Sequence, residues 1–329
     1  MSSHADEARM ADVLDLEQRL RDQIGRVLVG QDQVVGQVLT TLLADGHCLL
    51  EGAPGLGKTL LVRTLAACLG MEFSRVQFTP DLMPADITGT TFVRQDTGGQ
   101  HHFNFEPGPL FAEVVLADEV NRATPRTQSA LLEAMAEGSV TVGSQTHRLP
   151  ECFFVLATQN PIEMEGTYPL PEAQLDRFLF KILVPMPSPG QVVEILARTT
   201  TSVQTTPAPV AGRDELVAAQ ATVRDVVLAP HVAGYAVELV NATHPGRDAP
   251  AVTNRFVRYG ASPRGAQALV LGAKVAALRA GRAQVSLDDI RAQVQPALRH
   301  RLVLGFEAEA EELDADQVLE EIAMATRPG

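Results

Sequence analysis

The sequence predicts an α/β fold, in which a parallel sheet flanked by helices is followed by a smaller all-α domain. Short apolar runs of strand length alternate with stretches of helical periodicity, which is the pattern of a parallel sheet with helical crossovers. After the segment Pro185–Gly190, which contains three prolines, the strand signals stop and only helical patterns remain. A glycine-rich loop also joins the first apolar run to a helix, which is the setting of a phosphate-binding loop in an α/β core.

The expected elements follow in order along the chain. An amphipathic helix opens the protein, with apolar residues at helical spacing from Val13 to Ile24, and a second helix runs from Val34 to Leu43. The strands are apolar and short, as expected where both faces of a sheet are covered. They are Cys48–Leu50, Val76–Phe78, Val114–Ala117, Phe153–Ala157 and Ile182–Val184.

Composition shifts divide the chain into four parts. We expect a helical leader over residues 1–29, an α/β core over 30–187, a helical domain over 188–305 and an acidic C-terminal helix over 306–329. Ser262-Pro263 and Ser286 are strong helix starts in the helical domain. The acidic stretch Glu307–Glu321 is expected to be one solvated helix.

Charge and composition exclude several classes of protein. A net charge of −13 argues against a broad nucleic-acid surface. No run of about 18 apolar residues predicts a membrane span, and the acidic N-terminus is unlike a secretory signal. Cys48, Cys68 and Cys152 lie in apolar stretches, as buried free thiols do in a reducing compartment. We therefore expect a cytoplasmic protein.

The glycine-rich loop has the pattern G-x-x-x-x-G-K-[ST], which binds phosphate groups. Its backbone N–H groups and the helix dipole face phosphate oxygens, while Lys58 is expected to reach the β- and γ-phosphates and Thr59 to hold Mg²⁺. The predicted ligand is ATP. The residues expected to contact it are Gly52, Ala53, Pro54, Gly55, Leu56, Gly57, Lys58, Thr59, Leu60 and Arg264.

A second motif makes hydrolysis the expected reaction. The apolar strand Val114–Ala117 runs into Asp118 and Glu119, which is the Walker B pattern. Asp118 is expected to complete the Mg²⁺ site, mostly through water, and Glu119 to polarise the attacking water as general base.

Over residues 25–305 the chain resembles AAA+ ATPases, and among them the MoxR group. The phosphate loop, the Asp118-Glu119 pair and five further segments carry this resemblance. The further segments are Leu82–Gly89, Pro107–Phe111, Gln128–Met135, Ala157–Pro161 and Leu170–Phe178.

The resemblance assigns roles to four polar residues outside the phosphate loop. Asn160 corresponds to sensor 1 and joins Lys58 and Glu119 as a catalytic residue, although Asn-Pro is also a common turn. Arg177 corresponds to the arginine finger, which acts on a neighbouring subunit's γ-phosphate. A salt bridge with Asp176 or Glu172 is the alternative for Arg177, and Arg122 is a second candidate finger. Arg264 corresponds to sensor 2 in a lid helix, with a solvent-facing arginine as the alternative.

Two hairpins and one short linker complete the predictions. Phe92–Phe105, with Asp96–Gln100 as its turn, and Val140–Leu149 correspond to inserts that line the pore of a ring and touch a substrate. His101 and His102 are adjacent on a strand and point to opposite faces, so a shared metal site is not expected. The segment from Ile24 to Gln31 precedes the core, where an apolar adenine clamp lies in this superfamily, and ordinary core packing is the alternative for its apolar residues.

The resemblance implies a ring-forming ATPase, expected to be a homo-hexamer, that remodels or matures a protein partner. That partner is often a protein with a von Willebrand A domain. Two alternatives remain open from the sequence: a nucleic-acid motor or chelatase-like metal-insertion subunit, and a nucleotide-gated scaffold with negligible turnover. The acidic charge disfavours nucleic acid, and the complete set of catalytic residues disfavours the scaffold.

Overall fold

The computed structural model describes residues 2–95, 101–161, 166–200 and 206–327. Its centre is a five-stranded sheet with the order β2-β5-β8-β1-β9, in which every neighbouring pair is parallel. The strands are β1 (Cys48–Glu51), β2 (Phe73–Gln77), β5 (Val114–Asp118), β8 (Phe154–Gln159) and β9 (Phe180–Leu183). The predicted α/β fold is confirmed, and each predicted apolar run coincides with one strand.

Two strands, both at edges of the sheet, begin earlier than predicted. β9 starts at Phe180, two positions before its apolar run, and β2 starts at Phe73, three positions before the run that indicated it. The first residues of β2 are only half-buried or exposed. An edge strand needs an apolar face on one side only, so hydrophobicity alone underestimates its length.

Helices cover both faces of the sheet, and alternate residues of the central strands supply the two cores. Cys48 and Leu50 of β1 pack with α1 (Ser2–Val27), α2 (Asp32–Leu43) and α3 (Lys58–Leu69). Leu49 points to the opposite face, where it packs with α4 (Pro84–Thr88) and α5 (Pro125–Glu137). This period of two is the geometry of a strand buried on both sides. The predicted first two helices are confirmed, with Val13, Leu16, Leu20 and Ile24 all buried.

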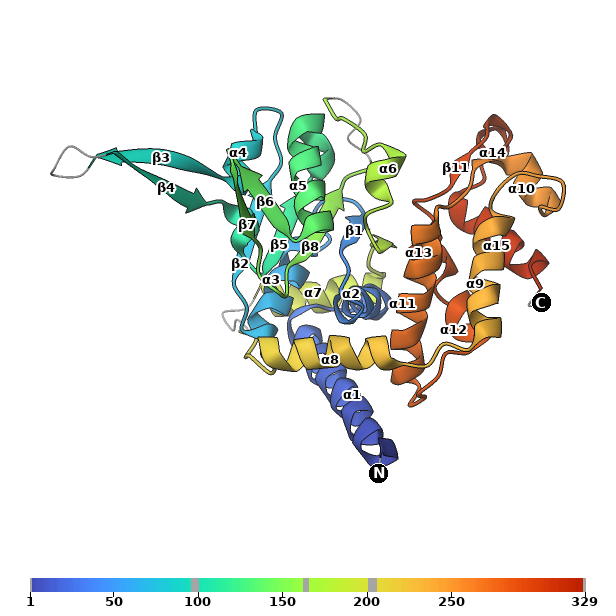
Figure 1. Cartoon of the computed structure of the whole chain (residues 1–329). Coiled ribbons are helices and arrows are strands. Elements are labelled where there is room, and N and C mark those ends of the chain that lie inside the picture. The colour runs from blue at the N-terminus through green and yellow to red at the C-terminus, as the bar shows by residue number, and fades with distance from the viewer. Residues whose placement is uncertain (1, 96–100, 162–165, 201–205, 328–329) are drawn as a thin grey trace.

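Beyond β9, helix α7 (Pro189–Thr199) leads into a C-terminal helical region. In Figure 1 its first helix, in yellow, lies along the lower side of the core, and the later helices, in orange to red, stand beside the core. Helix α11 begins as predicted, with Ser262 as the N-cap and Pro263 in the first turn. The helices are α8 (Arg213–Asp225), α9 (Pro230–Ala242), α10 (Ala251–Phe256), α11 (Pro263–Arg279), α12 (Leu287–Arg291), α13 (Val294–Leu298), α14 (Phe306–Ala310) and α15 (Ala315–Ala325).

Two features of the C-terminal helical region differ from the prediction. It contains a small antiparallel sheet of β10 (Val257–Tyr259) and β11 (Val303–Leu304), which are too short to give a strand signal. The acidic stretch after it is two helices rather than one solvated helix. The apolar side of α15 is buried, with Val318, Leu319 and Ile322 at most 1% exposed, so only its acidic side faces water.

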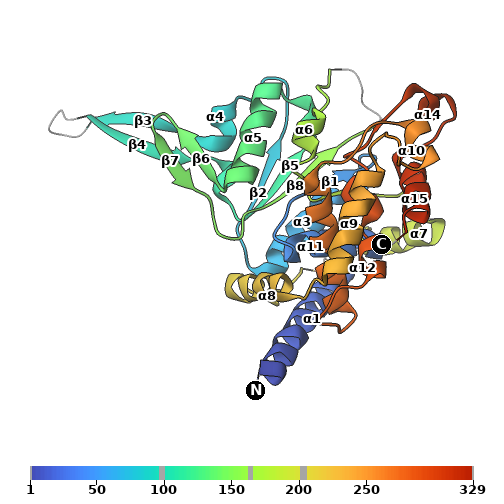
Figure 2. The same ribbon diagram turned by 45° about the vertical axis from the view of Figure 1, so that its right-hand side comes forward.

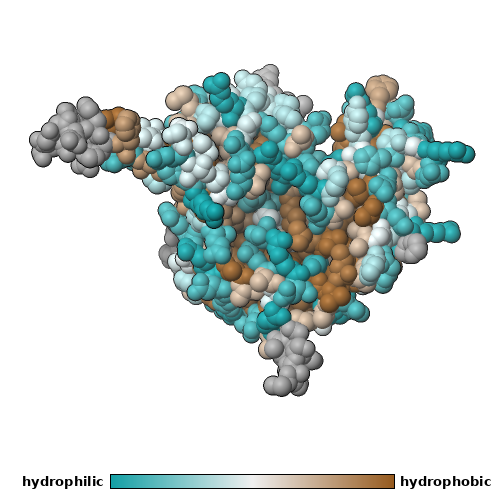
Figure 3. Space-filling model, viewed as in Figure 1, coloured by the Kyte–Doolittle hydropathy of each residue, from teal (hydrophilic) through white to brown (hydrophobic). Residues whose placement is uncertain are grey.

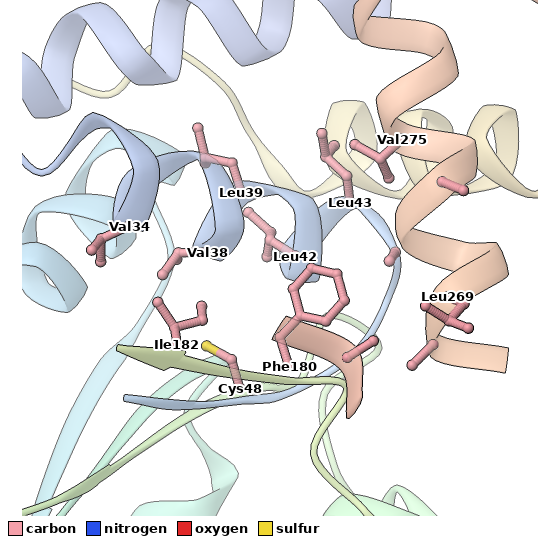
Figure 4. Close-up of a cluster of buried hydrophobic side chains, with 14 of the residues drawn as sticks. Val34, Val38, Leu39, Leu42, Leu43, Cys48, Phe180, Ile182, Leu269 and Val275 are labelled. Carbon is pink, nitrogen blue, oxygen red and sulfur yellow. The ribbon is translucent and has the colours of Figure 1, made fainter. Parts of the chain in front are cut away.

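A continuous hydrophobic cluster joins the C-terminal helical region to the core. Figure 4 shows Phe180 of β9 between Leu42 and Leu43 of α2 on one side and Leu269 of α11 on the other. All of these side chains are at most 2% exposed. The position of α11 relative to the sheet is therefore fixed by the same core that holds β1 and β9.

The two predicted hairpins are present and lie side by side on the core, away from the C-terminal helical region (Figure 1, Figure 2). They are β3 (Gly89–Gln95) with β4 (His101–Pro107), and β6 (Ser139–Val142) with β7 (Gln145–Arg148). Phe105 stacks on His147 with ring centroids 3.8 Å apart, which ties one hairpin to the other. The turn Asp96–Gln100 and the side chains of His101 and His102 lie outside the description.

Within the described residues, no helix combines the length and the apolar character that crossing a bilayer requires. The three cysteines are buried and unpaired, as predicted. Burial raises the pKa of the Cys68 and Cys152 thiols to about 11, so neither is a ready nucleophile.

A buried histidine connects the start of β1 to the two elements beside it. Nδ1 of His47 accepts a hydrogen bond from the N–H of Val155, and Nε2 lies 3.2 Å from the main-chain oxygen of Met135 at the end of α5. Because Nδ1 accepts, Nε2 carries the proton of the neutral ring. Burial lowers the pKa of His47 from 6.5 to about 4.

Because the pKa of His47 is lowered in the folded chain, the protein should lose stability in acid. The unfolded chain binds a proton at His47 below pH 6.5, and the folded chain binds it only near pH 4, so the free energy of unfolding falls as pH falls between these values. From pH 6.5 to 5 the loss is about 2 kcal/mol. Urea unfolding at pH 7.5 and 5 should therefore show a smaller pH effect for His47→Gln than for the wild type. The exposed His231→Gln is the control, and an equal pH effect in both variants would contradict this account.

Candidate functional site

The phosphate loop connects β1 to the first turn of α3 in the predicted conformation. Gly55 and Gly57 have φ angles of 81° and 79°, which only glycine adopts without strain, and Lys58 is the first residue of α3. Nζ of Lys58 donates to the main-chain oxygen of Gly52 at 2.6 Å. Desolvation lowers the pKa of Lys58, while the carboxylates of Asp118 and Glu119 oppose this. The ammonium group is thus held at the mouth of the loop.

A cleft of about 440 Å³ lies over the loop and brings most of the predicted site residues together. Its walls come from the loop and from the ends of three strands. It is lined by Pro54, Gly55, Leu56, Gly57, Lys58, Thr59, Leu60, Arg75, Gln77, Asp118, Glu119, Thr158 and Asn160. Gly52 and Ala53 lie beneath it and contact Lys58 through their carbonyl groups.

Parallel register explains why these residues meet. Glu51 at the end of β1 pairs with Gln159 of β8, and Gln77 of β2 pairs with Asp118 at the end of β5. The carboxyl ends of all these strands therefore meet at one edge of the sheet. Ligands of open α/β sheets bind at this edge.

The two acids after β5 are held by different partners. Asp118, 9% exposed, accepts from Thr158 Oγ1 at 2.6 Å and from Nη2 of Arg75 at 2.7 Å. Glu119 has a φ of 56°, and its N–H donates to Thr158 Oγ1 at 2.8 Å. Its carboxylate accepts from Gln77 Nε2 at 2.7 Å. Backbone strain of this kind persists only where the surroundings impose it, and here the Thr158 hydroxyl does so.

Sequence reasoning missed Arg75, Gln77 and Thr158. Two signals could have found them: Arg75 and Gln77 are polar residues two positions apart at the end of a strand, and Thr158 interrupts the apolar strand before Asn160. Residues at i and i+2 share a face, so Arg75 and Gln77 both reach the end of β5.

The proposed finger lies away from this cleft. Within the described residues, Arg177 lines no part of the cleft, and its guanidinium donates to the main-chain oxygen of Leu132 in α5. Neither Asp176 nor Glu172 pairs with it, so the salt bridge weighed from the sequence is not observed. Arg122, the other candidate, donates to the Glu119 carboxylate of its own chain at 2.8 Å.

Arg264 also lies outside the cleft. Its side chain is 51% exposed, and Nη1 is 3.7 Å from the carboxylate of Asp176. The carboxylate of Asp176, next to Arg177, is therefore the anionic partner of Arg264 within its own chain. The sensor 2 role of Arg264, with a phosphate as its partner, stays a prediction.

The segment predicted to hold the adenine base adjoins the loop. Nε2 of Gln31 donates to the main-chain oxygen of Leu56 at 2.9 Å, and Leu28 packs against Gly57. Ile24, in contrast, is buried in the core of α1. Gln31 and Leu28 therefore contact the phosphate loop, whereas Ile24 belongs to the core.

The donor set in the cleft suits Mg²⁺ rather than a transition metal. The hydroxyl of Thr59 and the carboxylate of Asp118 are hard oxygen ligands, which Mg²⁺ combines with phosphate oxygens and water. Among the described residues, no group of three or more His, Cys, Asp or Glu side chains could hold a metal without such help.

Comparisons with known proteins agree with this geometry. Residues 47–180 match the ATPase family associated with various cellular activities (AAA), and residues 250–322 match the AAA lid domain. The chain is 43% identical to Chaperone MoxR1 of Mycobacterium tuberculosis over 96% of its own length and 83% of the relative's. It is 33% identical to Protein MoxR of Methylorubrum extorquens, over 91% and 90% of the two chains.

This chain belongs to the MoxR family of AAA+ ATPases. A crystal structure of a Cytophaga hutchinsonii protein has the same fold, with a TM-score of 0.90 and 37% identity, covering 99% of this chain and 98% of that one. As in other AAA proteins, a nucleotide-binding core is followed by a helical lid, which we define as residues 250–322. The resemblance inferred from the motifs is thus confirmed.

Removing the Thr158 hydroxyl should lower the stability of this MoxR-family core. Thr158→Val removes one donor and one acceptor at a side chain that is 1% exposed. The Glu119 N–H then loses its acceptor, and the Asp118 carboxylate loses one of its donors and keeps Arg75. We expect the free energy of unfolding to fall by about 1–3 kcal/mol in chemical denaturation. Thr41→Val is the control, because its buried hydroxyl donates only to the Gln37 carbonyl within α2. Equal effects would contradict the role of Thr158.

Proposed function

We propose that this protein binds ATP with Mg²⁺ and hydrolyses it to ADP and phosphate. The observation that carries the proposal is the convergence of Lys58, Asp118, Glu119 and Asn160 on one cleft above a complete phosphate loop. Lys58 would contact the β- and γ-phosphates, and Glu119 would take up the proton of the attacking water. Asn160, 6% exposed at the end of β8, would orient that water or bond the γ-phosphate.

Mg²⁺, held by Thr59 and Asp118, would supply positive charge to the phosphate oxygens. The contact between Arg75 and Asp118 would weaken as the nucleotide and its cation arrive, since both cations use the same carboxylate. Gln77 and Arg122 hold the Glu119 carboxylate in the structure, so this base would be released only in the catalytic state.

We further propose that each site is completed by a second copy of the chain in a homo-oligomeric ring, for which six subunits are the expectation. Arg177 lies outside the cleft of its own chain and so does Arg264, and Asp176 connects the two. Guanidinium groups that lie outside the cleft of their own chain are suited to a neighbour's γ-phosphate. Arg177 is favoured over Arg122 because Arg122 is paired with the carboxylate of Glu119, whereas Arg177, among the residues that the structure describes, donates only to a main-chain carbonyl group.

The work of the ring would be to remodel or mature a partner protein. The β3–β4 hairpin projects from the core, and hydrophobic residues lie on it beside the grey atoms in Figure 3. Phe92, Val93 and Phe103 are 42%, 53% and 76% exposed. An exposed apolar arm suits an unfolded or loosely packed polypeptide better than a nucleic acid, and the net charge of −13 points the same way.

One relative is named a chaperone, which supports the same assignment. A partner with a von Willebrand A domain is the candidate that the family resemblance suggests. The partner of this chain is to be identified by its capture on a ring that holds ATP without hydrolysing it.

The first test removes the proposed base. Glu119→Gln keeps the shape of the side chain and its contact with Gln77 but cannot accept a proton, so hydrolysis should fall by about two to four orders of magnitude. The affinity for ATP, measured with a fluorescent nucleotide, should stay within a factor of about three. Glu137→Gln, at the exposed end of α5, is the matched control. Undiminished turnover in Glu119→Gln would remove this residue from its role.

The second test separates the two halves of a shared site. Arg177→Ala subunits keep an intact cleft, and Glu119→Gln subunits keep an intact Arg177. Mixing the two inactive variants should restore activity at those interfaces where an intact cleft meets an intact arginine. Steady-state ATPase rates over a series of mixing ratios measure this. A rate that never exceeds that of either variant alone would refute a site shared between subunits.

A further inference from the structure

A single buried arginine joins the lid to the segment of the core that carries Arg177. Arg301 follows α13 in the lid, and its side chain is 3% exposed. It reaches out of the lid and under the stretch from Asp176 to Leu179, which leads into β9. A fully buried guanidinium outside the nucleotide cleft is unusual, because a buried cation is stable only where it is paired and hydrogen-bonded.

Most of the hydrogen bonds of Arg301 are with this one stretch of the core. Nε donates to the Asp176 carboxylate at 2.8 Å, and Nη2 donates to the main-chain oxygens of Asp176 and Phe178 at 3.0 and 2.8 Å. Nη1 is 3.2 Å from the main-chain oxygen of Leu179 and also donates to Ala297 within the lid. The planar fork of the guanidinium therefore fixes three main-chain carbonyl groups, those of Asp176, Phe178 and Leu179, on both sides of Arg177.

Asp176 also contacts a second element of the lid, the N-terminal end of α11. Ser262 Oγ lies 2.9 and 2.8 Å from the two carboxylate oxygens, and Nη1 of Arg264 lies 3.7 Å away. Ser262 is also the N-cap of α11 and accepts from the N–H of Arg264. One carboxylate thus links the residue before Arg177 to the helix end that carries Arg264.

The link between Arg301 and Asp176 is an ion pair between two opposite charges. Burial lowers the pKa of Arg301, and the charge of Asp176 opposes this, so each ion is stable in place because the other is present. The neighbouring His300 is buried against the Phe178 carbonyl, and burial together with the charge of Arg301 lowers its pKa well below 6.5. His300 is therefore neutral and adds no second cation to the pair.

We propose that Arg301 is a positioning residue: through Asp176 it holds Arg177 of the core and Arg264 of the lid as one rigid unit that faces the neighbouring subunit's nucleotide. This inference rests on the proposed function, in which Arg177 acts between subunits. It adds that the geometry of the trans-acting face is set by the joint between core and lid. Misplacement of a transition-state contact by about 1 Å costs on the order of 100-fold in rate.

A purely structural role and a positioning role make different predictions. A residue that only stabilises the fold would weaken every property of the subunit, including its own cleft. A positioning residue would leave nucleotide binding in its own cleft intact and would impair only the face that it offers to a neighbour.

The experiment uses Arg301→Lys in the full-length protein. Lysine keeps the charge but cannot make the forked contacts. We expect an ATP affinity within about three-fold of the wild type and a hydrolysis rate lower by about 10- to 100-fold. Mixing with Glu119→Gln should restore activity, because an intact cleft of Arg301→Lys then meets the intact arginine face of the other variant. The mixture of Arg177→Ala with Glu119→Gln is measured in parallel.

The outcomes separate this inference from the proposed function. Recovery in the Arg177→Ala mixture without recovery in the Arg301→Lys mixture overturns the inference and leaves the shared site standing. No recovery in either mixture overturns both. Unchanged hydrolysis in Arg301→Lys alone also overturns the inference.

A second pair of variants tests the link without changing a buried charge. Ser262→Ala and Ser286→Ala each remove a serine N-cap whose hydroxyl contacts a carboxylate, but only Ser262 contacts Asp176; Ser286 contacts Asp289. Ser262→Ala should lower hydrolysis by several-fold and recover on mixing with Glu119→Gln, whereas Ser286→Ala should keep the wild-type rate. If Arg301→Lys does not fold, this pair decides, and equal rates in the two alanine variants overturn the proposal.

Discussion

The parallel pairing of β1, β8 and β5 is the constraint on which the site depends. Because the three strands run in the same direction and in register, the phosphate loop, the Asp118-Glu119 pair and Asn160 all leave the sheet at one edge. The buried hydroxyl of Thr158 then holds the strained backbone of Glu119 and the carboxylate of Asp118 together. A slip of one residue in either pairing would turn these groups to the opposite face. The register that packs the sheet therefore also places the residues of the cleft.

The joint between core and lid is the second determinant of the architecture. Phe180 packs between α2 and α11, and Arg301 crosses from the lid to the residues just before β9. This joint places the lid beside the sheet rather than over the phosphate loop. As a result the residues of the proposed site fall into two groups, one around the cleft and one around Asp176. The first group surrounds the phosphate loop, and the second contacts the lid through Asp176 and α5 through Arg177.

Local signals in the sequence predicted most of the fold and one half of the site. The loop Gly52–Thr59 and the paired acids are contiguous motifs, and the buried strands are apolar runs, so neither needs knowledge of tertiary contacts. Arg75 and Thr158 were missed because their role comes from contact with Asp118, about 40 positions away. The link between Asp176 and Arg301 spans 125 positions, and no local pattern marks it.

Other differences have equally physical causes. The pairing of β10 with β11 involves strands of two and three residues, which tertiary packing stabilises and propensity does not. The acidic charge of the last 24 positions suggested a solvated helix, whereas Val318, Leu319 and Ile322 form one buried apolar side of α15. Arg264 was assigned from its motif, but only the packing of α11 shows that it lies near Asp176 and not over its own phosphate loop.

The central claim is that one chain supplies the cleft and a second chain supplies the arginines. The most direct measurement is the ATPase rate per subunit as a function of protein concentration, with the oligomeric state followed by sedimentation in the same buffer. The rate per subunit should rise with the assembled fraction and fall toward zero where only monomers sediment. A rate per subunit that stays constant into the monomeric range would contradict the account, because a single chain would then contain the whole site.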